Sequence, residues 1–182
     1  MSRWFAFLRG INVGGHVVKM DALRAILEAL GFADVSTFIA SGNVIFEAES
    51  GSAAELQRRI EAALAAELGY GVPVFLRSAD DLRAIVTDCP FSAEELASAL
   101  VVYVVMLAEP VTDAERERVV ALTSDQDILR VVGREVYWLC RGNMSESPIF
   151  IKGLLEKALG RPATTRNMKT IQRLIAKYPK SS

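Results

Sequence analysis

Histidine and cysteine are scarce in this sequence of 182 residues. His16 is the only histidine, which excludes a histidine-rich zinc site and argues against most catalytic triads. Cys89 and Cys140 lie far apart along the chain, with no histidine near either of them, so we interpret both as buried free thiols in a reducing cytoplasm. From these absences we predict neither a metal site nor a cofactor.

Long apolar runs are also missing. The longest, at 99–108, has the length of a buried strand and falls short of the roughly 18 to 20 residues that cross a bilayer. The charged and apolar segments of a signal peptide are not found at the N-terminus. Since 51% of the residues are hydrophobic, a sizeable core is expected, and we predict a cytoplasmic protein with no membrane partner.

Charge is distributed unevenly, although the net charge is only −1. Residues 1–24 hold four Lys or Arg, and residues 152–182 hold eight, against one acidic residue in each segment. The segment between them is strongly acidic. Such asymmetry indicates either an anionic partner or an ordinary solvated surface, and both interpretations stay open.

The first part of the chain has the order β-α-β-β-α-β of a split ferredoxin-like unit. Helices are indicated by apolar residues at helical spacing, a stop at Gly31 and the capping pattern of Ser52 with Glu55. A hairpin turn is indicated by Gly42-Asn43. The expected elements are strand 3–9, helix 20–31, strands 35–40 and 43–48, helix 52–68 and strand 72–77.

The same order then repeats after two connecting helices that begin near Ser78 and Ser92. Its elements are strand 100–107, helix 112–122, strands 127–132 and 134–140, helix 147–160 and strand 162–166, followed by a last helix at 167–177. We therefore predict an α+β fold with two tandem ferredoxin-like βαββαβ halves, packed as one compact body, plus a C-terminal helix. The expected divisions are a first half at 1–77, connecting helices at 78–98, a second half at 99–166, and a basic helix and tail at 167–182.

The stretch LRGINVGG, residues 8–15, places glycines directly after the first strand. Gly10 and Gly15 have the spacing of a phosphate loop, but His16 and Val17 occupy the positions of its lysine and its serine or threonine. Those two residues supply the phosphate charge and the magnesium ligand. The sequence therefore excludes a nucleotide triphosphatase of that type.

A weaker interpretation of this loop remains. Glycines after a strand allow backbone N–H groups to converge on an anion, so Gly14 and Gly15 are candidate binding residues. Arg9, Asn12 and Lys19 would add side-chain donors. The alternative is a plain glycine loop that turns a corner of the sheet, with Arg9 paired to an acidic residue.

Ser41 and Asn43 flank the expected hairpin turn. A turn with a positive φ at Asn43 explains this stretch by itself. Ser41 has little support as a nucleophile, because the sequence lacks the G-x-S-x-G pattern and has one histidine. If these residues do more, we expect hydrogen-bond donors beside the glycine loop.

The C-terminal stretch is basic and begins with a helix start. Arg166 precedes Asn167, which is a good N-cap, and Lys169 opens a stripe of basic residues along one helix face. A helix N-terminus favours anions, and the stripe could meet a phosphate backbone. The alternative is a solvated helix face, since the sequence contains no RNA- or DNA-binding signature.

Three stretches, FLRGINVGG, STFIASGNVIFE and TTRNMKTIQRL, together resemble the bacterial proteins grouped as domain of unknown function 1697. The resemblance covers nearly the full chain and implies a compact α+β protein of the bacterial cytoplasm with paired ferredoxin-like halves, and no established reaction. Met168 and Lys169 stand where the family usually has tryptophan and asparagine, and His16 stands where it commonly has lysine.

We therefore expect a protein that binds a phosphate-bearing small molecule or a nucleic acid, as a monomer or homodimer. One alternative is an enzyme acting on a small phosphorylated or carboxylated substrate, and another is a structural homodimeric interaction module. No catalytic residue is assigned. The candidate ligand-binding residues are Arg9, Asn12, Gly14, Gly15, Lys19, Ser41, Asn43, Arg166, Asn167 and Lys169.

Overall fold

The computed structural model describes residues 1–12, 14–39, 42–49 and 51–179. The chain divides into two compact units. The N-terminal unit consists of residues 1–83 and the segment that begins at Leu174, and the C-terminal unit consists of residues 84–173.

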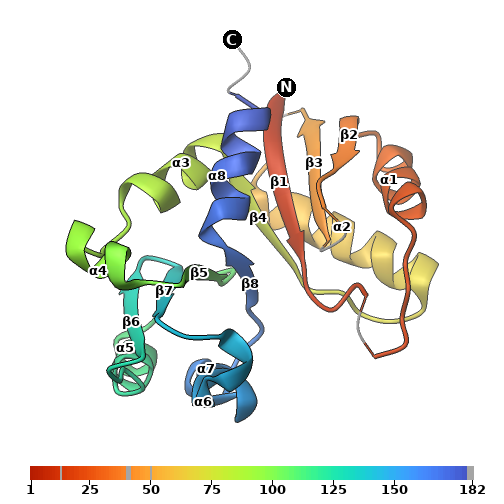
Figure 1. Cartoon of the computed structure of the whole chain (residues 1–182). Helices are drawn as coiled ribbons and strands as arrows, with labels where there is room; N and C mark the ends of the chain where they lie inside the picture. Colours follow the sequence, from red (N-terminus) through yellow and green to blue (C-terminus); the bar gives the residue numbers. More distant parts are fainter. Residues whose placement is uncertain (13, 40–41, 50, 180–182) are drawn as a thin grey trace. The chain divides into compact units, whose positions relative to one another are not determined.

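The N-terminal unit contains one antiparallel sheet in the order β2-β3-β1-β4 (Figure 1). Its strands are β1 (Ser2–Leu8), β2 (Ala33–Thr37), β3 (Asn43–Ala48) and β4 (Val74–Ser78). Its helices are α1 (Met20–Ala29) and α2 (Ala53–Leu68), and α3 (Ala79–Thr87) begins in this unit. Each of α1 and α2 connects a strand to a parallel strand two positions away, with one antiparallel strand between them, as in a ferredoxin-like unit.

Alternation along the strands divides the buried residues of this sheet between its two faces. On one face Ala6, Phe46 and Leu76 join the core formed with the apolar sides of α1 and α2. On the other face Phe5 is also buried, and its ring meets the ring of Tyr178 edge-on at 6.3 Å. Both faces of the sheet are therefore covered at β1, which explains the continuous apolar run in the second half of this strand.

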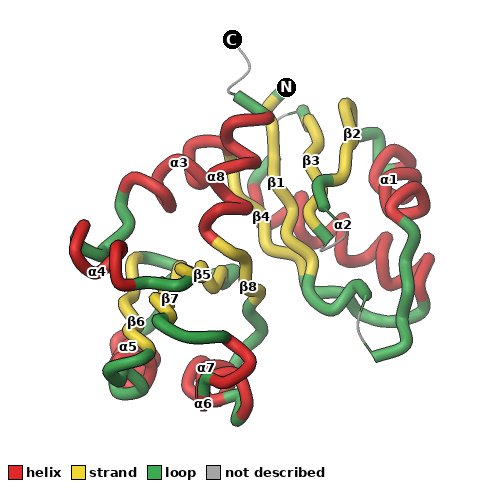
Figure 2. Tube along the Cα trace, in the orientation of Figure 1, coloured by secondary structure: helices red, strands yellow, loops and turns green. Residues whose placement is uncertain are grey.

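The C-terminal unit repeats this arrangement with the strand order β6-β7-β5-β8 (Figure 2). Its strands are β5 (Val101–Met106), β6 (Asp127–Val132), β7 (Glu135–Cys140) and β8 (Thr164–Asn167). Its helical segments are α4 (Ala93–Ser98), α5 (Asp113–Val120), η1 (Met144–Glu146), α6 (Pro148–Ile151), α7 (Leu154–Leu159) and the first part of α8 (Met168–Lys177). The two sheets with their helices and the C-terminal helix confirm the predicted fold class.

Strand register relates the two units residue by residue. Arg77 of β4 pairs with Phe5 of β1, and Arg166 of β8 pairs with Val104 of β5. Each arginine Nη1 donates a hydrogen bond to the carbonyl oxygen of the residue before it, over 2.8 Å for Arg77 and 2.9 Å for Arg166. The two units thus repeat the same topology and also the same buried arginine position.

The helix starts agree with the capping patterns in the sequence. Ser52 accepts a hydrogen bond from the N–H of Glu55 at the start of α2, and Ser92 and Thr112 form complete capping boxes. These contacts satisfy N–H groups that the first helical turn leaves without partners.

Two local expectations need correction. The helix expected over 147–160 is two short helices, because Gly153 adopts a left-handed conformation with φ 56° between α6 and α7. The expected turn conformation at Asn43 is wrong as well, since β2 ends at Thr37 and Asn43 is already the first residue of β3. The positive φ belongs to Gly42, at 74°.

In the described part of the chain, every helix is too short or too polar to cross a bilayer.

Candidate functional site

The glycine loop, residues 9–19, connects β1 to α1 in the N-terminal unit. Hydrogen bonds fix the loop where it leaves β1: the N–H of Leu8 donates to the Gly42 carbonyl over 2.9 Å, and that of Arg9 donates to Pro73 over 3.0 Å. Ile11, only 3% exposed, inserts into the core. Near the other end the Val18 N–H donates to Oδ1 of Asn12 over 2.9 Å. The loop is thus held at both ends by contacts that its sequence provides.

The middle of the loop faces open space. Gly14 and Gly15 are exposed, with φ values of 66° and 84°, and a Cβ on either would meet no atom within 4 Å. Among the residues that the structure describes, no hydrogen bond engages the N–H of Gly14 or Gly15. Glycine is needed here for the left-handed backbone, and the exposed peptide groups are accessible to a ligand.

The polar side chains of the loop have different roles. Lys19 is exposed at the start of α1, whereas Arg9 is half-buried. Asn12 is exposed, but its carbonyl oxygen is already used by Val18. Asn12 therefore acts as a brace of the loop.

The hairpin between β2 and β3 lies beside this loop, through the hydrogen bond from Leu8 to Gly42. Asn43 is 1% exposed, and its Nδ2 donates to the carbonyl oxygen of Phe38 over 2.8 Å, so it holds the hairpin closed. Ser41 lies outside the described residues. The predicted proximity of hairpin and glycine loop is thus present at Gly42, while the Asn43 side chain points into the protein's own backbone.

Arg166, Asn167 and Lys169 belong to the C-terminal unit, at the end of β8 and the start of α8. Arg166 is 8% exposed, and its Nη1 donates to Oγ1 of Thr164 over 2.7 Å. Burial away from water lowers the pKa of Arg166 to about 10. The side chain of Asn167 accepts a hydrogen bond from the Lys169 N–H over 2.9 Å, which is the capping contact expected from the sequence.

One aromatic contact escaped the sequence analysis. The ring of His16 lies 4.0 Å from the ring of Tyr70, with a tilt of 31° between their planes. Tyr70 follows α2 and is 54 positions away, and no periodicity or motif connects two such residues. This contact gives the histidine of the glycine loop a packing role.

Metal binding finds no support in the described part of the chain, where no group of three or more His, Cys, Asp or Glu side chains could hold an ion. The glycine loop presents exposed N–H groups and a cationic side chain at Lys19, groups of the kind that can bind anions.

A family model described as "Protein of unknown function (DUF1697)" matches residues 1–137. No match was found among curated proteins. Among solved structures, a similar chain is the conserved bacterial protein SP0830 from Streptococcus pneumoniae, with a TM-score of 0.71 and 22% identity, covering 97% of this chain and 98% of that chain. At this identity the likeness concerns the fold alone.

Proposed function

This chain belongs to the DUF1697 family of proteins of unknown function, and we propose that it binds a phosphate-bearing ligand, a nucleotide or a nucleic acid, at the glycine loop. The observation that carries this proposal is the state of Gly14 and Gly15. Both are exposed and left-handed, and their N–H groups have no partner among the described residues.

Rigid anchoring supports binding at this loop. Its first residues are tied to Gly42 and Pro73, and Asn12 braces its last residues through Val18. Loop ends that are already fixed lose little conformational freedom when a ligand binds, so more of the interaction free energy appears as affinity.

Charge selects the class of ligand. Lys19 is exposed at one end of the loop, and Arg9 lies at the other. Backbone N–H groups between two cations favour a phosphate, because its oxygens accept several charge-assisted hydrogen bonds together. The role of Arg166, Asn167 and Lys169 in such binding stays a prediction. A substitution of Lys169 tests it separately.

Titration calorimetry with inorganic pyrophosphate, AMP, ATP and a single-stranded RNA of ten nucleotides would test the proposal. We expect saturable binding, and replacement of Lys19 by Gln should weaken it by about tenfold, equivalent to roughly 1.4 kcal/mol. The matched control is Arg58→Gln, which removes the same charge from an exposed position on α2 and should change affinity less than twofold. If no phosphate compound binds, or if both substitutions weaken binding equally, the proposal is wrong.

Two further comparisons define the ligand and the site. Affinity for RNA that decreases steeply with salt, beyond the decrease for AMP, would identify a nucleic acid, because each phosphate contact releases counterions. Lys169→Gln, with Lys157→Gln as its control in the same unit, measures whether the start of α8 takes part.

A further inference from the structure

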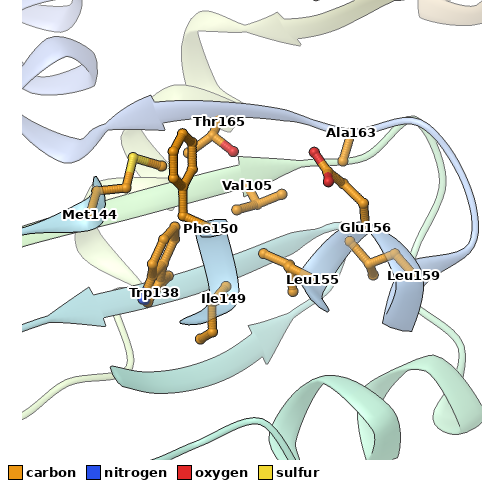
Figure 3. A pocket seen from close by; sticks show the side chains of 10 residues that line it. All are labelled: Val105, Trp138, Met144, Ile149, Phe150, Leu155, Glu156, Leu159, Ala163 and Thr165. Carbon is orange, nitrogen blue, oxygen red and sulfur yellow. The ribbon is translucent and has the colours of Figure 1, made fainter. Parts of the chain in front are cut away.

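A pocket of about 200 Å³ lies in the C-terminal unit, between the sheet and helices α6 and α7 (Figure 3). Val105, Trp138 and Thr165 line it from three neighbouring strands, and Ile149 and Leu155 line it from the two helices. These residues, apart from Thr165, are members of the core cluster of this unit. The pocket therefore occupies space that belongs to the hydrophobic core in an ordinary unit of this fold.

The N-terminal unit provides an internal comparison. By strand register, Ala6, Phe46 and Leu76 correspond to Val105, Trp138 and Thr165. All three residues of the N-terminal unit are at most 2% exposed and belong to its core. The change from Leu76 to Thr165 removes apolar volume and introduces a hydroxyl at the same position in the sheet.

The helix that packs on the sheet also differs between the two units. In the N-terminal unit α2 is continuous over 16 residues and buries Leu56, Ile60 and Leu64. Its counterpart in the C-terminal unit is interrupted at Gly153, which separates α6 from α7. Phe150, which lines the pocket from α6, is 55% exposed, so the pocket reaches the surface beside the interruption.

The wall formed by Trp138 is fixed by a buried hydrogen-bond chain. Nε1 of Trp138 donates to Oδ1 of Asp127 over 2.7 Å, and Oγ of Ser147 donates to Oδ2 of the same carboxylate over 2.9 Å. Ser147 in turn accepts a hydrogen bond from the Ile149 N–H over 3.2 Å. The indole and the start of α6 are thus held together, and the pocket is preformed.

Two polar groups define the chemistry of a ligand. Among the ten lining residues Glu156 alone is charged, and Figure 3 shows its carboxylate and the Thr165 hydroxyl on the side of the pocket next to β8. The remaining lining is aliphatic, aromatic or thioether. A complementary ligand has an apolar body and a cationic head that donates hydrogen bonds to the Glu156 carboxylate.

We propose that this pocket binds a small primary ammonium compound, with an arylalkyl or branched alkyl body among Val105, Trp138 and Leu155 and its ammonium group beside Glu156. An apolar cavity of about 150 Å³ holds benzene, so the pocket suits a molecule of about eight to ten non-hydrogen atoms. 2-Phenylethylammonium is the probe that fits this description.

Tryptophan fluorescence gives a direct measurement, because the chain has two tryptophans and Trp4 lies in the N-terminal unit. In a Trp4→Phe protein, Trp138 reports on the pocket alone. We expect 2-phenylethylammonium to change this fluorescence saturably, and 3-phenylpropionate to bind more weakly because its carboxylate faces that of Glu156. The absence of a saturable change with the ammonium compound would overturn the proposal.

Variants separate the charge from the cavity. Glu156→Gln should weaken ammonium binding roughly two- to fivefold and leave the neutral 2-phenylethanol unaffected, as is usual for an ion pair near the surface. The matched control is Glu94→Gln, an exposed position on α4 outside the pocket, which should change neither affinity. Equal effects of Glu156→Gln and Glu94→Gln would refute the assigned role of Glu156.

Thr165→Leu introduces the residue that the N-terminal unit has at this position and should abolish binding while the unit remains folded. Ala163→Leu fills the pocket beside Glu156 and provides a second cavity variant. Binding that persists in a folded form of either variant would contradict the location of the site. Because the glycine loop lies in the other unit, its phosphate titration remains a separate test.

Discussion

Gly42 lies against Ile11 so closely that a Cβ at Gly42 would stand 2.8 Å from Cγ2 of Ile11 and 3.2 Å from Cβ of Leu8. This contact joins the hairpin to the start of the glycine loop. Since φ at Gly42 is also 74°, an alanine there combines backbone strain with a steric clash. We expect Gly42→Ala to lower the free energy of unfolding by about 2 kcal/mol or more.

Two other glycines serve as controls for that substitution in urea denaturation. Gly14→Ala introduces the left-handed strain without a neighbour within 4 Å and should cost about 1 kcal/mol, and Gly71→Ala has neither feature. The order of destabilisation should be Gly42, then Gly14, then Gly71. Equal effects at Gly42 and Gly71 would contradict the close approach to Ile11.

Asp127 is 1% exposed and accepts hydrogen bonds from Trp138 and Ser147. Asp127→Asn replaces one accepting oxygen by a donor that faces another donor, so we expect a loss of about 2 to 3 kcal/mol. Chemical denaturation followed by circular dichroism measures it. Asp125→Asn, two positions away and exposed, should be almost neutral. A similar stability of both variants would show that this chain of hydrogen bonds contributes little.

Ionisation of Tyr137 should lower the stability of the folded protein at alkaline pH. Burial raises the pKa of its hydroxyl strongly, and that hydroxyl donates to the carbonyl oxygen of Ile85 over 2.8 Å. In the unfolded chain the tyrosine ionises near its ordinary pKa of about 10, so its stabilisation is complete below that pH and is lost as pH rises above it. Tyr137→Phe should therefore reduce stability at pH 8 and flatten the decline between pH 10 and 11. An unchanged decline in the variant would contradict this assignment.

Glu115 ties the start of α5 to the segment before β8. Its Oε2 accepts from the Thr112 N–H over 2.8 Å, and Nε of Arg161 donates to its Oε1 over 2.9 Å. These hydrogen bonds lower the pKa of Glu115, so the stabilisation is present above the ordinary glutamate pKa and is lost as pH falls through the folded value.

Glu115→Gln should cost about 1 kcal/mol at pH 7, and the difference from the wild type should shrink toward pH 3. Thermal denaturation across this pH range measures both effects. Glu117→Gln, exposed on the same helix, should show no such dependence. If the stability lost in Glu115→Gln were the same at every pH, the ionised Glu115 carboxylate would not be the source of this stabilisation.

Local patterns in the sequence were sufficient to predict most elements of the fold. Strands 43–48 and 127–132 have the bounds of β3 and β6, and the capping residues Ser52, Ser92 and Thr112 begin the helices they were expected to begin. Apolar spacing and capping act between residues a few positions apart, so they are visible in a single sequence.

The break at Gly153 shows the limit of that reasoning. Apolar residues keep helical spacing on both sides of it, and an isolated glycine inside a helical pattern is usually tolerated. Whether the chain continues as a helix or turns there depends on what packs beneath it, and here a pocket lies beneath α6 and α7.

The sequence by itself determined the order of elements and its repetition in two halves, because both depend on local conformational preferences. Only the tertiary structure decided that Asn43 closes a hairpin, that Arg166 is largely buried, and that a pocket lies beside Trp138 and Thr165. These outcomes depend on which side chains meet across strands far apart in the chain, and burial and close packing, rather than local preference, select those meetings.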